Sequence, residues 1–500
     1  MKQSFKATVL CVIFWLGAFS SYAIKPEIIE STRKAIVSID VRISLSAYDK
    51  TGVFAGTGFV NNLAKGLIVT NKHVVGGANI GQYFVTFANG QKVEAKVKYY
   101  DECYDFAILQ VDPKAIPKEV SQITFSDKSP ALNQSVFIVG NNEGQSFSFH
   151  DGRISNLYNV TKAQQNYVVS LNVAGGSSGS PAVNEDGEAI GLHFGGSKTY
   201  GLSLKGDYVK NALAALAQNT LPPRKTMGAL CSMYSLDDAV MHRSFPADLV
   251  AKYLKDFPDA MNKVLQIRST IPSTPAASKL QSGDIVWEVN GKAVGPSLYN
   301  LDREIDNSKD NKIELAIYRA GKKLLINVDL YDLRDYQITK LVEFGGAVLF
   351  HSDHLNSFLT GMPLKSLAVA DIKQGMSMSN IPIFYVNYEN VKNYRLRITA
   401  IGNNPVHDLD SFISAIDKLN GSKYTNIDFQ NYQMYYIGWN TFMNSDHELL
   451  KADITLDETD FKPRIFNLNP VTLEWELQSE KSQSEKSQSE KSQNEESIVN

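Results

Sequence analysis

The sequence has little cysteine, little excess charge and no long apolar run after its first 23 residues. Only three cysteines occur in 500 residues, and Cys11 lies within the N-terminal apolar run. The remaining two, Cys103 and Cys231, can form at most one bridge. A disulfide framework is therefore excluded, and hydrophobic packing must hold the core together.

Charge gives no sign of a nucleic acid or an anionic membrane as partner. Lysine and arginine number 50 against 53 aspartate and glutamate, for a formal net charge of −3, and the basic residues are not clustered. With 500 residues, 43% of them hydrophobic, the chain is long enough for about three domains of typical size. We expect a globular, multidomain protein.

The first residues are typical of an export signal. Lys2 and Lys6 precede an apolar run at 7–19, and small residues follow at 21 and 23. This pattern predicts a cleavable signal peptide over residues 1–23. An uncleaved anchor is the alternative, but the run is shorter than the about 20 residues that a spanning helix needs. We expect a periplasmic protein if the source is a Gram-negative bacterium, and a secreted one otherwise.

The first half of the chain is rich in short strands. Between residues 35 and 190, short runs of Val, Ile and Phe alternate with Gly, Asn and Asp, which predicts an all-β barrel or sandwich. A helix is expected at 206–218, and Leu221-Pro222-Pro223 follows it. We therefore place the end of a first domain, 24–222, at these prolines.

Two smaller units and a tail are predicted beyond this boundary. A turn, a strand and an Asn-Gly hairpin at 283–292, followed by a helix at 298–306, indicate an α+β module over 223–333. A similar succession at 398–429 indicates a diverged repeat and a second module over 334–456. Residues 457–500 are expected to form a tail, with Q-S-E-K-S repeats from 478 that are too polar to bury.

Three segments carry residues suited to nucleophilic catalysis. His73 follows an apolar strand, Asp105 opens another, and Ser178 lies in a turn rich in glycine and serine. The order His, Asp, Ser is that of the chymotrypsin-type double β-barrel. A serine hydroxyl needs an imidazole to take its proton, and the imidazole needs a carboxylate to hold it in the right tautomer. We predict a catalytic triad of His73, Asp105 and Ser178.

The glycines around Ser178 point to an oxyanion hole. The main-chain N–H groups of Gly176 and Ser178 are expected to bind the developing negative charge, along a backbone path that larger side chains would obstruct. The strand after the nucleophile is the predicted lining of the substrate pocket and favours a small or aliphatic residue before the cut bond. Its candidate residues are Ile190, Leu192, His193 and Phe194.

Other residues compete for the triad positions. His150 and His193 are rival bases, but neither follows an apolar strand in a comparable context. Asp101 and Asp112 are rival carboxylates. These alternatives remain open at the level of sequence.

Taken together, the motifs resemble the HtrA/Deg family of serine proteases. The resemblance extends over the chain to about residue 455, and its motifs are Gly56-Thr57-Gly58-Phe59, Asp105-Phe106-Ala107-Ile108-Leu109, Asp151-Gly152-Arg153-Ile154-Ser155, Ser273-Thr274-Pro275-Ala276-Ala277 and Asn290-Gly291-Lys292. Most members have Asn-Ser-Gly-Gly at the nucleophile, whereas Ser177 precedes Ser178 here. That departure resembles the subgroup of the yeast nuclear HtrA-like protease and its large plant relatives.

The resemblance implies an ATP-independent serine endopeptidase that acts on unfolded or damaged proteins, assembles as a trimer or larger oligomer and has chaperone activity. It implies no cofactor and no metal. It also implies that the two modules are PDZ-like, with a peptide-binding loop in the first at Met261, Asn262, Lys263 and Val264. Because this loop lacks glycines, a role in packing or assembly is the alternative. A non-proteolytic chaperone or scaffold with a latent protease domain is the alternative function, and an esterase is disfavoured.

Overall fold

The structure is a computed structural model that describes residues 24–48, 51–142, 145–171, 175–381, 393–419, 421–436, 442–444 and 449–478. The predicted signal peptide and the repeats of residues 479–500 lie outside the described residues. Within these ranges, every helix is too short or too polar to pass through a bilayer.

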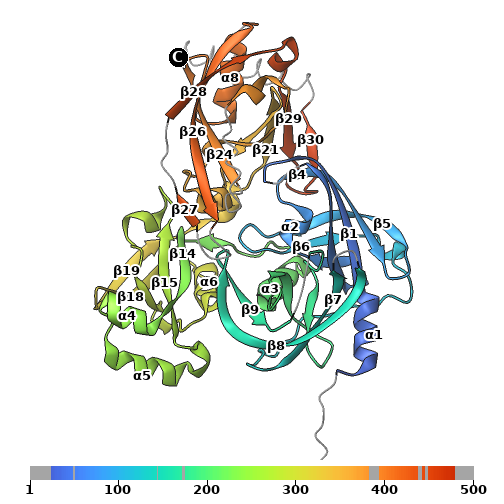
Figure 1. Cartoon of the computed structure of the whole chain (residues 1–500), viewed down its shortest axis with the longest axis vertical. Coiled ribbons are helices and arrows are strands. Elements are labelled where there is room, and N and C mark those ends of the chain that lie inside the picture. Colours follow the sequence, from blue (N-terminus) through green and yellow to red (C-terminus); the bar gives the residue numbers. More distant parts are fainter. Residues whose placement is uncertain are drawn as a thin grey trace, which may run out of the picture.

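Two closed six-stranded barrels form the first part of the chain (Figure 1). The first barrel consists of β1 (Ile36–Ser46), β2 (Gly52–Asn62), β3 (Leu67–Thr70), β4 (Asn79–Phe87), β5 (Lys92–Tyr100) and β6 (Ala107–Gln110). The second consists of β7 (Ser135–Asn142), β8 (Gln145–Thr161), β9 (Gln164–Val169), β10 (Pro181–Val183), β11 (Ala189–Gly196) and β12 (Gly201–Lys205). The predicted chymotrypsin-like double barrel is confirmed.

The α-helices that accompany the barrels in the described residues are α1 (Pro26–Ala35), the one-turn α2 (Lys72–Val75) and α3 (Gly206–Ala217). The last is the helix expected at 206–218. Tyr208 and Val209 of α3 pack with Phe59 of the first barrel and Leu204 of the second in one buried cluster. This shared apolar core fixes the two barrels to each other, so that residues from both can contribute to one site.

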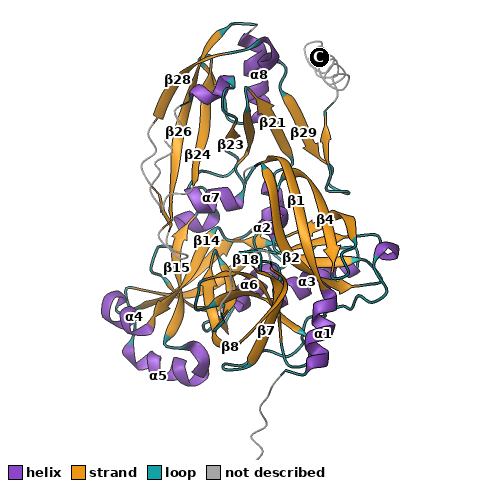
Figure 2. Cartoon of the chain, turned by 45° about the vertical axis from the view of Figure 1, so that its right-hand side comes forward, coloured by secondary structure: helices purple, strands orange, loops and turns teal. Residues whose placement is uncertain are grey.

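The first C-terminal module is a sheet in the order β14-β15-β16-β18-β19 with helices on its flanks (Figure 2). Its elements are β14 (Ala229–Ser235), α4 (Leu236–Arg243), α5 (Ala247–Asp256), β15 (Lys263–Thr270), β16 (Ile285–Val289), β17 (Lys292–Ala293), α6 (Leu298–Asp306), β18 (Lys312–Arg319) and β19 (Lys322–Asp329). A short ladder between β13 (Lys225–Thr226) and β20 (Tyr331–Asp332) joins the two ends of the module. The helix predicted at 298–306 coincides with α6.

The second module repeats this succession and lies above the barrels in Figure 1. Its elements are β21 (Lys340–Phe344), β22 (Ala347–His351), α7 (His354–Thr360), β23 (Leu367–Ile372), β24 (Asn393–Ile401), β25 (Asn404–Pro405), α8 (Leu409–Leu419), β26 (Tyr424–Tyr436), β27 (Phe442–Asn444), β28 (Leu449–Thr455), β29 (Arg464–Leu468) and β30 (Trp475–Leu477). The elements β24, β25, α8 and β26 follow one another as β16, β17, α6 and β18 do.

The second module extends beyond residue 456, where the sequence analysis placed its end. Strand β29 pairs with β21, and β30 pairs with β29, so that both belong to the same sheet. Ile465, Phe466 and Leu468 are buried, which gives this segment an apolar face that the polar repeats after residue 478 lack. The segment up to 478 is therefore part of the fold.

A buried ion-pair network joins the first barrel to the first module. Arg224 Nε lies 2.7 Å from Asp101 Oδ2, and Arg224 Nη1 lies 3.3 Å from Asp306 Oδ2 at the end of α6. Asp101 is fully buried and also accepts hydrogen bonds from the Tyr99 hydroxyl and the Tyr104 main chain. Arg224 is thus the counter-charge for carboxylates of both domains.

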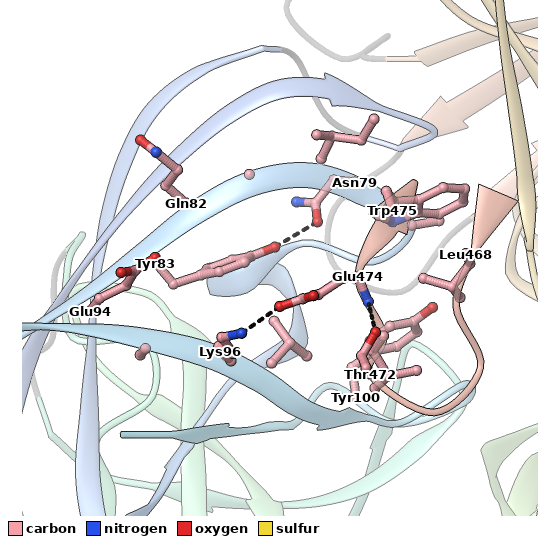
Figure 3. A pocket seen from close by; sticks show the side chains of 16 residues that line it. Asn79, Gln82, Tyr83, Glu94, Lys96, Tyr100, Leu468, Thr472, Glu474 and Trp475 are labelled. Carbon is pink, nitrogen blue, oxygen red and sulfur yellow. Dashed lines mark hydrogen bonds and ion pairs between the residues drawn. The ribbon is translucent and has the colours of Figure 1, made fainter. Parts of the chain in front are cut away.

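The second module contacts the first barrel at a separate place. A cavity of about 340 Å³ lies between β4, β5 and the turn that joins β29 to β30. Figure 3 shows the Lys96–Glu474 ion pair and the Tyr83–Asn79 hydrogen bond at its wall, with Trp475 on the opposite side. None of the predicted triad residues lines this cavity.

We expect Arg224→Ala to lower the free energy of unfolding by about 3–5 kcal/mol, because it leaves buried Asp101 without its counter-charge. Lys92→Ala removes a half-exposed pair with Asp40 and serves as the control, with an expected cost of at most about 1 kcal/mol. Urea unfolding of both variants checks this. A loss of similar size in the two variants would contradict the role given to Arg224.

The same interface is expected to weaken as the pH rises. Burial raises the pKa of Asp302 to about 7, against the lowering effect of the Tyr208 hydroxyl that donates to it. Because the pKa in the fold is above that of the unfolded chain, the stabilising contribution is present in acid and is lost as the pH rises through 7. The free energy of unfolding of Asp302→Asn should therefore rise relative to that of the native chain when the pH is raised from 6 to 8, as measured by urea unfolding. If the difference between the two proteins is the same at both pH values, the role given to Asp302 is contradicted.

Candidate active site

His73 and Asp105 lie side by side because the strands next to them pair in the first barrel. His73 is in α2, directly after β3, and Asp105 precedes β6. The two strands are antiparallel neighbours, with Thr70 opposite Ala107. Residues 32 positions apart in sequence therefore meet at one end of the barrel.

A hydrogen bond joins the imidazole of His73 to the carboxylate of Asp105. His73 Nδ1 lies 2.7 Å from Asp105 Oδ2, and the His73 main-chain N–H donates to Oδ1 at 3.0 Å. The Asp105 N–H donates to Gln164 Oε1 at 2.8 Å, and its carbonyl accepts from the Asn71 side chain at 2.8 Å. Since an ionised carboxylate only accepts hydrogen bonds, Nδ1 carries the proton and Nε2 is left as a base.

The surroundings keep Asp105 ionised. Burial by itself would raise the pKa of this carboxyl, but the charge and the hydrogen bond of His73, with a further contribution from Lys162, hold it well below its usual range. The carboxylate can therefore stabilise a positive charge on the imidazole without taking up its proton.

The turn that carries Ser178 is pressed against the first barrel. Thr57 of β2 donates its N–H to the Ser178 carbonyl at 2.9 Å, and its hydroxyl donates to the Gly176 carbonyl at 2.8 Å. Gly179 has a φ of +92°, and a Cβ atom there would lie 1.8 Å from the Thr57 oxygen and 2.6 Å from the Thr70 hydroxyl. Only glycine fits at this position, and the contact brings the turn next to the strand that leads to His73.

The described residues show no hydrogen bond between Ser178 Oγ and His73 Nε2. Among the described residues, the main-chain N–H groups of Gly176 and Ser178 also have no hydrogen-bond acceptor. Catalytic hydrogen bonds are often long in the absence of substrate and shorten when it binds. The two N–H groups of the predicted oxyanion hole are therefore unoccupied donors.

The rival carboxylates are engaged elsewhere. Asp101 accepts from Arg224 and Tyr99, as described above, and Asp112 caps the short helix at Pro113–Ala115 by accepting from Lys114. The rival base His150 lies on β8, opposite Ile138. None of the three is hydrogen-bonded to His73 in the described structure.

The predicted lining of the substrate pocket is wrong for three of its four residues. Leu192 and Phe194 are 0% and 3% exposed and pack in the core between the barrels and α3. Ile190 is 6% exposed and packs in the interior of the second barrel. The central strand β11 is covered on both faces, so its apolar residues fill cores. His193 is also buried, at 1% exposed, but its main chain is hydrogen-bonded to Gly179 and Ser180 beside the nucleophile.

The predicted peptide-binding loop of the first module is also wrong. Met261, Asn262, Lys263 and Val264 lead into β15, which already pairs with β14 on one side and β16 on the other. Addition of a peptide strand needs a free edge, and the strands at the edges of this sheet are β14 and β19. A cavity of only about 50 Å³ lies between β14 and α6, and Cys103, Tyr104 and Ala163 of the first domain are among the residues that line it.

In the second module the corresponding edge is occupied by the chain itself. Strand β22 pairs with β21 through the turn at Gly345-Gly346, both of which have positive φ. Phe344 of β21 is buried and makes an edge-to-face contact with Phe412 of α8 at 5.3 Å. A strand and a side chain of this protein thus fill the place that a peptide would take.

Comparison with known proteins agrees with the fold. The model of the "Trypsin-like peptidase domain" matches residues 56–192, a range that includes all three predicted triad residues. An uncharacterized protein of Rickettsia prowazekii is 40% identical over 193 residues, which cover 38% of this chain and 98% of that protein. A pro-apoptotic serine protease NMA111 of Phaeosphaeria nodorum is 28% identical over 469 residues, or 89% of this chain.

This chain belongs to the HtrA family of serine proteases. It spans 45% of the length of the Phaeosphaeria relative, so this HtrA-family chain corresponds to less than half of that protein. A solved HtrA-type protease, AlgW with a tripeptide, is 18% identical with a TM-score of 0.44, covering 62% of this chain and 97% of its own. Another similar structure is a serine endoprotease from Yersinia pestis, 19% identical with a TM-score of 0.41, covering 62% of this chain and 100% of that one.

In this HtrA-family chain we expect Asp105→Asn to lower kcat on the order of 1,000- to 10,000-fold with the fold intact, because an amide no longer enforces the Nδ1–H tautomer of His73. The measurement is hydrolysis of a fluorogenic peptide. Asp112→Asn, a change of the same kind at an exposed cap, is the matched control and should leave kcat within about twofold of the native value. Equal losses in the two variants would rule out the role of Asp105.

Proposed function

We propose that this chain is an ATP-independent serine endopeptidase that uses His73, Asp105 and Ser178 as its catalytic triad. The observation that carries the proposal is the His73–Asp105 hydrogen bond, which lies where the turn of Ser178 meets the first barrel. The pair supplies an oriented base, and the turn supplies a hydroxyl and two free N–H donors.

The reaction follows from these groups. Ser178 Oγ attacks the carbonyl carbon of the scissile peptide bond while its proton passes to His73 Nε2. Asp105 stabilises the imidazolium, and the N–H groups of Gly176 and Ser178 bind the oxyanion. The intermediate collapses when His73 protonates the leaving amine, and an ester to Ser178 remains. Water, activated by the same imidazole, then hydrolyses the ester and restores the hydroxyl.

The substrates we propose are unfolded or damaged polypeptides. Support comes from family membership. We further propose that the chain is exported by its N-terminal signal and works as a trimer or larger oligomer with chaperone activity. No cofactor or metal enters the reaction as written.

A latent protease is the alternative that one observation favours. Among the described residues Ser178 and His73 are not hydrogen-bonded to each other. In this alternative the resting site is incomplete, and it assembles when substrate binds. In that case a chaperone function would persist without proteolysis. Suppression of aggregation by Ser178→Ala protein would identify this second activity.

Cleavage of unfolded casein tests the proposal. We expect Ser178→Ala to abolish cleavage while its thermal unfolding stays that of the native chain, because the acyl-enzyme ester cannot form without the Ser178 hydroxyl. Ser155→Ala replaces an exposed serine of β8 and is the matched control. Undiminished cleavage by the Ser178→Ala protein would overturn the assignment.

A further inference from the structure

His193 is a buried polar side chain whose hydrogen bonding is incomplete. It is 1% exposed, and neither ring nitrogen makes a well-aligned hydrogen bond in the described part of the chain, where the Leu202 main chain is the polar group beside the ring. A buried imidazole of this kind is costly to the fold, and such groups are rare in native structures. The cost indicates that His193 completes its hydrogen bonding only when a ligand is bound.

Its main chain places His193 next to the nucleophile. The His193 carbonyl accepts from the Gly179 N–H at 2.9 Å, and its N–H donates to the Ser180 carbonyl at 2.8 Å. His193 is opposite Ser203 in the ladder, and Ser203 is opposite Tyr167, which packs in the interior of the second barrel. Residues directly opposite each other in an antiparallel pair share a face of the sheet, so the imidazole of His193 faces the interior of the second barrel.

Gly201 of β12 lies close against the ring. A Cβ atom at this position would lie 3.2 Å from Cε1 of His193 and 2.9 Å from the Leu171 side chain. A larger residue at 201 would therefore displace the ring.

A second group with incomplete hydrogen bonding lies beside the ring. Ser203 of β12 is the direct ladder partner of His193, and its side chain is fully buried. Its hydroxyl has no hydrogen-bond partner among the described residues. An imidazole and a hydroxyl on neighbouring strands are thus both available to one ligand group.

The groups nearest to His193 suit an anion better than a cation. Burial, and then the coulombic effects of His73 and His150, lower the pKa of His193 to about 3, while a main-chain hydrogen bond with Leu202 acts in the opposite direction with a smaller effect. The ring is therefore neutral in the resting protein, and the groups that shift its pKa are two histidines and a main-chain group rather than carboxylates.

We infer that His193 and Ser203 form the floor of the pocket for the residue before the cut bond and select an acidic side chain, Glu or Asp. The inference rests on the proposed endopeptidase function. A carboxylate there accepts hydrogen bonds from the Ser203 hydroxyl and the His193 N–H, and a proton taken up from solvent completes an imidazolium–carboxylate pair. An aliphatic side chain would leave both groups without partners. The inference replaces the small or aliphatic preference expected from the sequence.

The test uses the full chain and fluorogenic peptides that differ only in the residue before the cut bond, with Glu, Gln, Val or Lys. We expect kcat/KM for Glu to exceed that for Val by about tenfold or more, since a polar site left unpaired discriminates strongly. His193→Val should reverse this order, whereas His193→Gln, which keeps an N–H donor, should retain part of the preference for Glu. Thermal unfolding of each variant checks that it is folded.

Two results would overturn the inference. One is a native chain that prefers Val to Glu, and the other is an unchanged ratio of Glu to Val cleavage in His193→Val. If casein and every peptide remain intact, the proposed function fails. The preference of the pocket for an acidic side chain is then tested separately, by measuring peptide binding. In fluorescence anisotropy with Ser178→Ala protein, a labelled peptide ending in Glu should bind about tenfold more tightly than one ending in Val. Equal affinities would reject the pocket.

Discussion

The contact between the nucleophile turn and the first barrel is the constraint on which the site depends. Ser178 belongs to the second barrel and His73 to the first, and neither barrel alone contains a complete site. Gly179 lies against Thr57 and Thr70 with no room for a Cβ atom, and Thr57 bonds to both Gly176 and Ser178. The common apolar core beneath these strands keeps the contact in register.

The two C-terminal modules share a topology but differ at the edge of the sheet. In the first, residues of the protease domain line the small cavity between β14 and α6. In the second, strand β21 pairs with the edge, and Phe344 packs on Phe412. Gln165 connects the protease domain to the first module, because its side chain accepts hydrogen bonds from Ser297 and Tyr299 at the start of α6. The side chain of the adjacent Gln164 accepts a hydrogen bond from the Asp105 main chain. The arrangement of the modules and the position of the catalytic carboxylate are therefore physically connected.

Local patterns were sufficient for the elements and for the pairing of His73 with Asp105. Strands at 35–190, the helix at 206–218 and α6 follow from periodicity and from turn residues, which act over a few positions. The prediction of the pocket lining was wrong because the sequence of β11 does not show which of its faces packs against a second core. Leu192 and Phe194 lie on a strand that is covered on both sides. The peptide-binding loop failed because the order of strands in a sheet depends on long-range pairing. The incomplete hydrogen bonding of the buried His193 likewise becomes visible only when β11 and β12 are placed together.

The most direct test of the central claim is labelling of the native chain with a fluorophosphonate probe, followed by mass spectrometry to locate the modified residue. Reaction requires a serine whose hydroxyl is activated by a neighbouring base, and it needs no knowledge of the substrate. The account predicts a label on Ser178 that is lost when His73 is replaced by alanine. A native chain that takes no label, or takes it at another serine, would contradict it.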